Sequence, residues 1–336
     1  MNETRRELLA AFAEGPATGP ALAERLSVSR AAVWKQVEAL RGAGFDIEST
    51  DDGYAITAVP DYGAAAIEYE LAAPYTVEYH ESIGSTNDRA RELAADGDRD
   101  IVVVADEQTG GRGRLARSWA SPSGGIWAST VLDPSLPAAH VPLVTLAAGV
   151  AVVDACRAVG VDATLKWPND VLVDDAADSE GGDAGATADA DRGDAANSDA
   201  DDRGGRKLSG ILTEMEGEAD RVSWLLVGIG LNANIAGDAL PAGATSLQEQ
   251  VGPVDRRAVL QTILESLSTL VDEPDTIIER WRAYSSTLGR TVRVDTGRAQ
   301  IEGEAVDIQF PGALVVDTGS GEEIIHAGDC EHLRPA

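Results

Sequence analysis

The run Gln108–Ser121 brings three glycines and three arginines together in a chain that is otherwise strongly acidic. It follows Ile101–Ala105, an apolar and largely β-branched run that predicts a buried strand. Glycine lets backbone N–H groups approach an anion closely because no Cβ intervenes. Arginine adds a planar, permanently charged donor that suits phosphate or carboxylate. We therefore expect a strand that ends in a loop folded around a negatively charged ligand.

Two familiar nucleotide-binding motifs are disfavoured at this loop. Gly111–Ala116 fits the dinucleotide pattern G-x-G-x-x-A, but that motif needs a helix to begin at the glycines. The following run Arg117–Gly125 contains Ser, Pro and paired Gly, which disfavour a helix. A Walker A loop would need Gly-Lys followed by Ser or Thr, and the sequence has none. A flexible basic surface loop remains the alternative to an anion-binding loop.

Length and composition predict a soluble globular protein of two or three domains, with 336 residues of which 43% are hydrophobic. The net charge of −30 is too acidic for an ordinary nucleic-acid binder and is typical of a halophile protein, whose self-repulsion is screened by salt. No window approaches 18 apolar residues and no apolar signal region begins the chain, so we expect a cytoplasmic protein without a membrane partner. The two cysteines form neither a disulfide framework nor a metal motif.

Residues 1–57 predict a winged helix-turn-helix. Helices are expected over Arg5–Glu14, Ala17–Leu26 and Arg30–Arg41, followed by a hairpin wing over 47–57. The last helix of such a unit enters a major groove. The candidate DNA-facing residues are Ser29, Arg30, Trp34, Lys35 and Arg41. The net charge of this segment is −3, which weakens phosphate contacts, so a plain interaction module is the alternative.

A linker over 59–75 is expected to lead into a mixed α/β region. In the turn Ile83–Asn87, the hydroxyls of Ser85 and Thr86 suit a helix N-cap, which is compatible with ligand binding by the same groups. The run Asp174–Gly205 interrupts the region with eleven acidic residues, two arginines and almost no large apolar residue. It cannot bury enough surface to offset its ordering entropy, so we expect a disordered insertion.

The run Ala163–Val173 predicts two strands around a stiff bend, because Pro168 fixes φ and removes a donor. Lys166, Asn169 and Asp170 then project polar groups from this bend. Asp170 is a candidate for holding a metal or polarising a lysine. An Asn-Asp turn capped by its own side chains is the alternative.

Lys207 lies at the start of the next expected strand, Arg206–Glu214, near Gly210, where a backbone can approach a ligand. A surface hairpin lysine is the alternative, although lysines are scarce in this chain. Residues 289–336 contain short strand patterns divided by glycine turns, which predict a small SH3-like barrel.

At five places these residues resemble the family of bifunctional biotin–protein ligases and biotin operon repressors. The matching runs occur in family order and are Ser85–Asn87, Gln108–Trp119, Lys166–Asp170, Lys207–Leu212 and Gly228–Asn232. The likeness extends to the N-terminal winged helix and to Gly328–Arg334, and it leaves out Asp174–Gly205. It implies an α+β chain with four parts: a winged helix-turn-helix DNA-binding domain (1–58), a linker (59–75), a central mixed α/β, class II synthetase-like catalytic domain (76–288) and a C-terminal SH3-like β barrel (289–336).

The resemblance implies a ligase that uses MgATP to convert biotin to biotinyl-5′-AMP and then transfers biotin to one lysine of a biotin carboxyl carrier domain of a biotin-dependent carboxylase. It also implies biotin-responsive repression at a DNA operator and a homodimer. The first step brings a carboxylate to a phosphate, and these two anions repel each other. Arg112, Arg114 and the glycine-loop amides suit the neutralisation of both.

The same resemblance assigns roles to individual residues. The catalytic residues are Arg114, Lys207 and Asp170. The biotin-binding residues are Ser85, Thr86, Asn87, Gln108, Arg112, Gly113, Arg114, Lys207 and Gly210. The ATP-binding residues are Arg112, Arg114, Trp119, Lys166, Asn169 and Asn232, with Trp119 stacked on adenine. Asp170 promotes attack by the acceptor lysine, with Mg²⁺ coordination as its competing role.

Two alternatives differ in function class. A DNA-binding biotin sensor without ligase activity would lose the catalytic residues, yet Arg114, Lys207 and Asp170 are all present. A lipoate–protein ligase would follow a similar acyl-adenylate route. The Gly-Arg-Gly-Arg and Lys-Trp-Pro-Asn-Asp runs favour biotin over lipoate.

Overall fold

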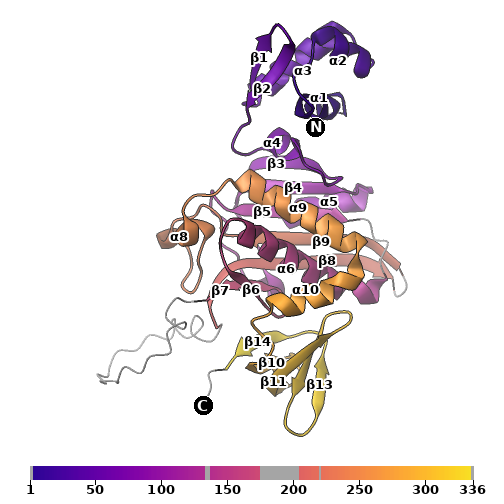
Figure 1. Cartoon of the computed structure of the whole chain (residues 1–336). Coiled ribbons are helices and arrows are strands. Elements are labelled where there is room, and N and C mark those ends of the chain that lie inside the picture. Colours follow the sequence, from indigo (N-terminus) through magenta and orange to yellow (C-terminus); the bar gives the residue numbers. More distant parts are fainter. Residues whose placement is uncertain (1–2, 133–136, 175–203, 219–220, 334–336) are drawn as a thin grey trace.

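The computed structural model describes residues 3–132, 137–174, 204–218 and 221–333 (Figure 1). A central sheet carries one small unit at each end, formed by the N-terminal and C-terminal parts of the chain. The predicted acidic insertion Asp174–Gly205 lies outside the described residues except at its two ends.

The N-terminal unit has the predicted order of three helices and a two-stranded wing. Its elements are α1 (Glu3–Ala13), α2 (Gly19–Arg25), α3 (Arg30–Gly42), β1 (Asp46–Thr50) and β2 (Gly53–Ala58). The Ser29 hydroxyl caps α3 by accepting a hydrogen bond from the Ala32 N–H. Val33 and Val37 point into a small separate core, which leaves the opposite face of α3 in solvent.

The predicted linker is wrong in one respect, because it contains the helix α4 (Ala64–Glu68). The fully buried Ile67 packs into the central core, whereas Tyr69 packs into the N-terminal core and meets the Phe45 ring edge-on. This short helix therefore joins the two cores. Five residues are too few to show a helical period in a sequence.

The central sheet has seven strands in the order β3-β4-β5-β9-β8-β7-β6. The strands are β3 (Thr76–Ile83), β4 (Ile101–Gln108), β5 (Ile126–Leu132), β6 (Ala163–Lys166), β7 (Asp170–Val173), β8 (Arg206–Glu218) and β9 (Arg221–Leu231). Only β3 and β4 pair in parallel; the other neighbours are antiparallel. The continuous apolar run of β4 is buried on both faces, as expected for a strand covered by helices on each side.

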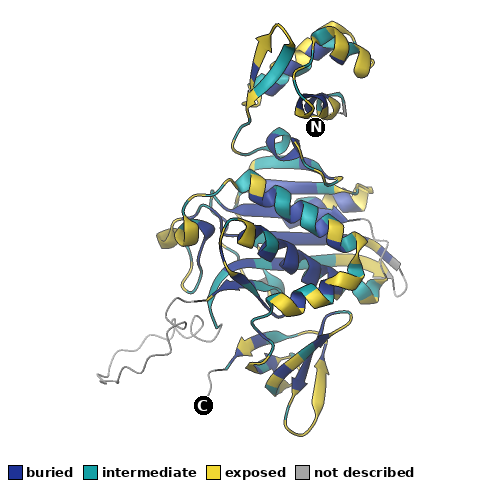
Figure 2. Cartoon of the chain, viewed as in Figure 1, coloured by how far each residue is buried: buried dark blue, intermediate teal, exposed yellow. Residues whose placement is uncertain are grey.

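Helices cover both faces of this sheet. The helices α6 (Val141–Ala158), α9 (Arg256–Asp272) and α10 (Ile277–Tyr284) lie on the face seen in Figure 1, and α6 is the most deeply buried of them (Figure 2). The opposite face is packed by α5 (Thr86–Asp96) through Ala90 and Leu93. The short helix α8 (Leu247–Val251) follows β9.

The apolar character of α6 corrects one prediction from sequence. Together with the turn that precedes it, over Ala138–Ala158, this helix is long and apolar enough to cross a membrane, although no such window was expected. Its most apolar window is 67% buried in the protein, against β8 and α9. Core packing therefore accounts for its composition.

The C-terminal unit is a five-stranded antiparallel sheet in the order β13-β12-β11-β10-β14. Its strands are β10 (Thr291–Asp295), β11 (Gln300–Gln309), β12 (Ala313–Asp317), β13 (Glu322–Ile325) and β14 (Asp329–His332). The buried Trp167 indole donates to the Gly312 carbonyl across 3.0 Å, which ties this unit to the bend between β6 and β7. As a result, β14 lies beside the edge of the central sheet that carries that bend.

Candidate active site

The glycine–arginine loop between β4 and β5 folds back on itself. The Trp119 N–H donates to the Gly111 carbonyl at 2.9 Å, and the Gly113 N–H donates to the Arg117 carbonyl at 2.8 Å. Its only regular turn among the described residues is the three-residue stretch Arg114–Ala116, so no helix begins at the glycines, as predicted. A Cβ on Gly111 would lie 2.6 Å from the Trp119 carbonyl oxygen, so this tight crossing requires glycine.

The loop covers a cavity of about 480 Å³ on the sheet. Every sequence-predicted catalytic, biotin-binding and ATP-binding residue lines it: Ser85, Thr86, Asn87, Gln108, Arg112, Gly113, Arg114, Trp119, Lys166, Asn169, Asp170, Lys207, Gly210 and Asn232. These residues come from β3–α5, β4, the loop, β6–β7, β8 and β9. The structure therefore brings together residues that are up to 147 positions apart in the chain, namely Ser85 and Asn232.

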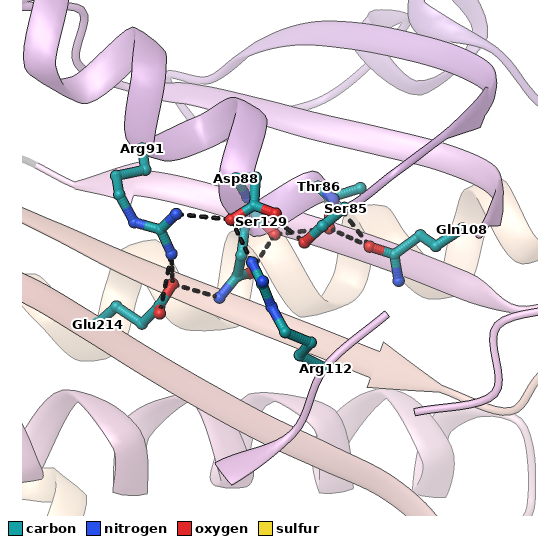
Figure 3. A network of polar contacts seen from close by, with 9 residues as sticks. Ser85, Thr86, Asp88, Arg91, Gln108, Arg112, Ser129 and Glu214 are labelled. Atoms are coloured by element: carbon teal, nitrogen blue, oxygen red, sulfur yellow. Dashed lines mark hydrogen bonds and ion pairs between the residues drawn. The ribbon is translucent and has the colours of Figure 1, made fainter. Parts of the chain in front are cut away.

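One end of the cavity is lined by neutral hydrogen-bonding groups. The Thr86 N–H and Oγ1 both donate to Gln108 Oε1, at 2.8 and 3.0 Å. Gln108 Nε2 in turn donates to Ser121 Oγ at 3.0 Å. Ser85 caps α5, so the predicted capping role and a position in the cavity occur together. The fully buried Ser129 on β5 completes this group, with its Oγ 2.7 Å from Thr86 Oγ1 (Figure 3).

Ser129 was missed from sequence, and the glycines of β9 were named only within the matching run Gly228–Asn232, without a role of their own. Gly230 lies under the loop with Gly210 of β8, and both face Trp119, whereas Gly228 faces Asn87. A Cβ on Gly230 would lie 2.8 Å from Trp119 Nε1, and a Cβ on Gly228 would clash with Asn87 Oδ1. Glycine inside a strand often marks a close approach of this kind, which is the signal that the sequence offered.

The other end of the cavity is cationic. Arg114 Nη1 donates to Asn169 Oδ1 at 3.0 Å, and Nη2 donates to the Gly328 carbonyl at 2.9 Å. Lys207 Nζ lies 2.6 Å from Asp170 Oδ1 and 5.0 Å from the centre of the Trp119 ring. The two cations project from different elements toward one volume, as neutralisation of a polyanion requires.

The bend between β6 and β7 positions part of this end. Its Trp167–Pro168 peptide bond is cis. The bend places Lys166, which is only 5% exposed, in the wall of the cavity beside β14. Burial raises the pKa of the Cys330 thiol to about 12. Burial, followed by the charges of Lys166 and Arg290, lowers the pKa of His332 to about 3. Both groups are therefore neutral near pH 7, and the lysine supplies the positive charge here.

The protein provides few metal ligands at this place. Among the described residues, no group of three or more His, Cys, Asp and Glu side chains lies close enough to hold a metal ion. Asp170 is a single carboxylate already paired with Lys207. A site of this kind suits Mg²⁺ only where substrate phosphates supply further ligands.

The candidate DNA-facing residues lie far from this cavity, on α3. Ser29, Arg30, Trp34 and Lys35 are exposed, and Trp34 is 57% exposed. Arg41 differs from them, because its guanidinium donates to the Ile47 carbonyl of the wing and to Glu38. Arg30, Trp34 and Lys35 therefore form one solvent-facing group on α3 that is available to DNA.

Comparison with known proteins gives three family matches. Residues 79–232 match the biotin/lipoate A/B protein ligase family, residues 4–55 an HTH domain, and residues 287–333 the biotin protein ligase C-terminal domain. The bifunctional ligase/repressor BirA of Bacillus subtilis is 32% identical, over 97% of this chain and 98% of the relative. A biotin–[acetyl-CoA-carboxylase] ligase of Mycobacterium tuberculosis is 31% identical, over 75% of this chain and 86% of its own.

A solved structure supports the same architecture. Biotin protein ligase from Aquifex aeolicus in complex with biotin and ATP matches with a TM-score of 0.59 and 26% identity. The match covers 76% of this chain and 99% of that one.

Proposed function

This chain belongs to the family of bifunctional biotin–protein ligases and biotin operon repressors, and from that premise we propose that it activates biotin with ATP to biotinyl-5′-AMP and transfers biotin to a lysine of a biotin carboxyl carrier domain. The main support is the cavity of about 480 Å³ under the glycine–arginine loop, which is neutral and hydrogen-bonding at one end and cationic at the other. An acid with a polar, uncharged head and a carboxylate tail matches that polarity.

We assign the neutral end to the ureido head of biotin. Ser85, Thr86, Asn87 and Gln108 supply donors and acceptors there. Gly210, the other residue assigned to biotin, leaves room beside Trp119 and Lys207 because it has no Cβ. The biotin carboxylate then points toward Arg112, Gly113, Arg114 and Lys207. Planar guanidinium groups and backbone N–H groups suit that anion.

The nucleotide belongs at the cationic end. Arg112, Arg114, Lys166 and Lys207 would neutralise the phosphates, so the attacking carboxylate and the α-phosphate can come together. Trp119 would offer its ring to adenine, while Asn169 and Asn232 line the nucleotide end. The Asn232 amide also donates to the Thr245 carbonyl at 2.9 Å, so part of its role is to hold the chain after β9. Mg²⁺, held by ATP phosphates with Asp170, would add positive charge when bound.

Transfer to the acceptor lysine needs a neutral amine. Asp170 lies beside Lys207 at the same end of the cavity and is the carboxylate placed to take that proton. Closure of the loop over the adenylate would keep water from hydrolysing it.

The winged helix makes the chain a biotin-responsive repressor as well, in the cytoplasm and as a homodimer on its operator. The acidic surface suits a halophile. The described residues contain Arg114, Lys207 and Asp170 together in one cavity, which disfavours a sensor without ligase activity. We divide the chain into a DNA-binding domain (1–58), a linker (59–75), a catalytic domain (76–288) and a C-terminal domain (289–336). The linker helix α4 contacts both the DNA-binding and the catalytic domain.

The first prediction tests the reaction itself. Purified protein incubated with MgATP and biotin should yield biotinyl-5′-AMP, detected by mass, together with pyrophosphate. Lipoate in place of biotin should yield little acyl-AMP, because its dithiolane ring has no ureido group for the neutral end. An equal yield of lipoyl-AMP would overturn the choice of biotin, and no acyl-AMP with either acid would overturn the ligase.

The second prediction concerns α3. Removal of both exposed cations, by Arg30→Ala with Lys35→Ala, should weaken operator binding in the presence of biotin and ATP. The slope of log K against log salt should become shallower by about 2, since each phosphate contact contributes roughly 0.9. Arg25→Ala is the matched control, because it removes an exposed cation of α2 that is paired with Glu14. An unchanged slope in the double variant would mean that α3 does not meet the phosphates.

A further inference from the structure

Glu214 of β8 lies behind the neutral end of the cavity and holds Asn87. Asn87 Nδ2 donates to Glu214 Oε2 at 3.0 Å. Glu214 does not line the main cavity, whereas Asn87 does. Glu214 instead lines a second, neighbouring cavity under the same loop, with Asp88, Arg91 and Arg112. From sequence, a glutamate on a strand suggests a solvated face, so nothing pointed to it.

This contact determines which way the Asn87 amide faces. A carboxylate can only accept hydrogen bonds, so the amide nitrogen must face Glu214. The amide oxygen then faces the fully buried Ser129, whose Oγ lies 2.5 Å from it, and the floor at Gly228. The carbonyl side of Asn87 is thus presented where the cavity begins.

Ser129 leaves the Asn87 amide oxygen with spare acceptor capacity. Its Oγ lies 2.7 Å from Thr86 Oγ1 and 2.5 Å from Asn87 Oδ1. The Ser129 hydroxyl has one proton, whereas an amide oxygen has two lone pairs, so Ser129 can fill only one of them. Asn87 Oδ1 can therefore also accept from an N–H donor of a ligand, such as a ureido N–H.

Arg91 of α5 holds Glu214 in turn. Its Nη2 donates to both oxygens of Glu214, at 2.9 and 2.8 Å, and its Nη1 donates to Asp88 Oδ1 at 2.6 Å (Figure 3). Asp88 also accepts from Arg112 of the glycine–arginine loop. Although burial of Asp88 favours its neutral form, the hydrogen bond from Arg91 and the charge of Arg112 outweigh this and lower its pKa. A continuous polar network thus joins the head-group end of the cavity to the loop.

We propose that Glu214 and Arg91 are positioning residues for biotin. Glu214 orients the Asn87 amide so that its oxygen accepts from the ureido head, and Arg91 fixes Glu214 while linking it through Asp88 to Arg112. This inference depends on the proposed function, because it assigns the ureido group to the end of the cavity that Asn87 lines.

The test compares Glu214→Ala, Glu214→Gln and Arg91→Met with Arg89→Met. Arg89 is the matched control: it lies on the same helix and is ion-paired with Glu78 and Glu92, outside the network.

Glu214→Ala leaves Asn87 Nδ2 without its acceptor and should raise the biotin KM by roughly 10-fold or more. Glu214→Gln, which keeps the shape, should have a smaller effect. In Glu214→Ala and Glu214→Gln the ATP KM and kcat should stay within about 3-fold, because Glu214 contacts Asn87 and Arg91 and not the residues assigned to the phosphates. Arg91→Lys should partly restore what Arg91→Met loses.

A binding measurement separates orientation from general damage. Wild-type protein should bind a biotin analogue methylated at its ureido nitrogens at least about 10-fold more weakly than biotin by calorimetry, since a buried acceptor is then unpaired. Glu214→Ala should lose most of that discrimination. Parallel rises of both KM values, or unchanged discrimination in Glu214→Ala and Glu214→Gln, would overturn the proposal. Failure of the wild type to make biotinyl-5′-AMP would instead overturn the ligase assignment.

Discussion

Arg114→Ala should lower the rate of biotinyl-5′-AMP formation by about 100- to 1,000-fold, the loss typical for removal of one charge-stabilising donor from an enclosed site. Arg114 is 27% exposed at its side chain and projects into the cationic end of the cavity. Without it, the approach of a carboxylate to a phosphate loses one of its compensating charges. Pyrophosphate release with biotin and MgATP at saturation measures this step directly.

A second effect of the same change must be separated from the first. Arg114 also ties the loop to the C-terminal unit, through the Gly328 carbonyl and the 3.6 Å approach to Asp329 Oδ1. Arg117 of the same loop pairs with Asp329 as well. Arg117→Ala therefore weakens the tie to the C-terminal unit and should cost only several-fold. Comparable losses in the two variants would show that the tie, rather than charge at the phosphate, matters. Near-normal pyrophosphate release in Arg114→Ala would refute its role.

Much of the fold was predictable because its signals are local. The buried strand β4 is a continuous β-branched run, and the helix-turn-helix has its Ser29 cap and its apolar face in the sequence. The glycine–arginine loop was predictable for the same reason, since the chemistry of an anion site is concentrated in one short run. The placement of every predicted ligand residue around one cavity follows from the order of strands that those runs form.

What could not be predicted depends on contacts between distant segments. Nothing local distinguishes the Glu214 carboxylate, which acquires a function only because Asn87 and Arg91 meet it from α5. The Gly328 carbonyl reaches Arg114 only because Trp167 fastens the C-terminal sheet to the bend. Ser129 offered a weak signal as a polar residue within the apolar strand Ile126–Leu132. A buried hydroxyl needs a partner, and the partner's identity is a property of the fold.

Lys207→Met should reduce adenylate formation by about 100- to 1,000-fold, because it removes one of the cations at the end of the cavity that receives the phosphates. The same change leaves Asp170 without its ion-pair partner, because Asp170 Oδ1 lies 2.6 Å from Lys207 Nζ. A loss caused only by that unpaired carboxylate would be repaired in the double variant Lys207→Met with Asp170→Asn, since both members of the pair are then neutral. We expect no repair, because the reacting anions still lack their counter-charge.

The single variant Asp170→Asn completes the double-mutant cycle with Lys207→Met. It also separates the two half-reactions. If Asp170 takes the proton of the acceptor lysine, the variant should form biotinyl-5′-AMP at a near-normal rate. It should then transfer biotin from supplied biotinyl-5′-AMP to the carrier domain about 100-fold more slowly or worse, the usual contribution of a general base. The defect should shrink as pH rises, because a larger fraction of the acceptor amine is then already neutral. Loss of the first half-reaction, relieved by raising the Mg²⁺ concentration, would instead place Asp170 on the metal. The expected pattern makes Lys207 the residue of adenylate formation and Asp170 the residue of transfer, although the two side chains form one ion pair.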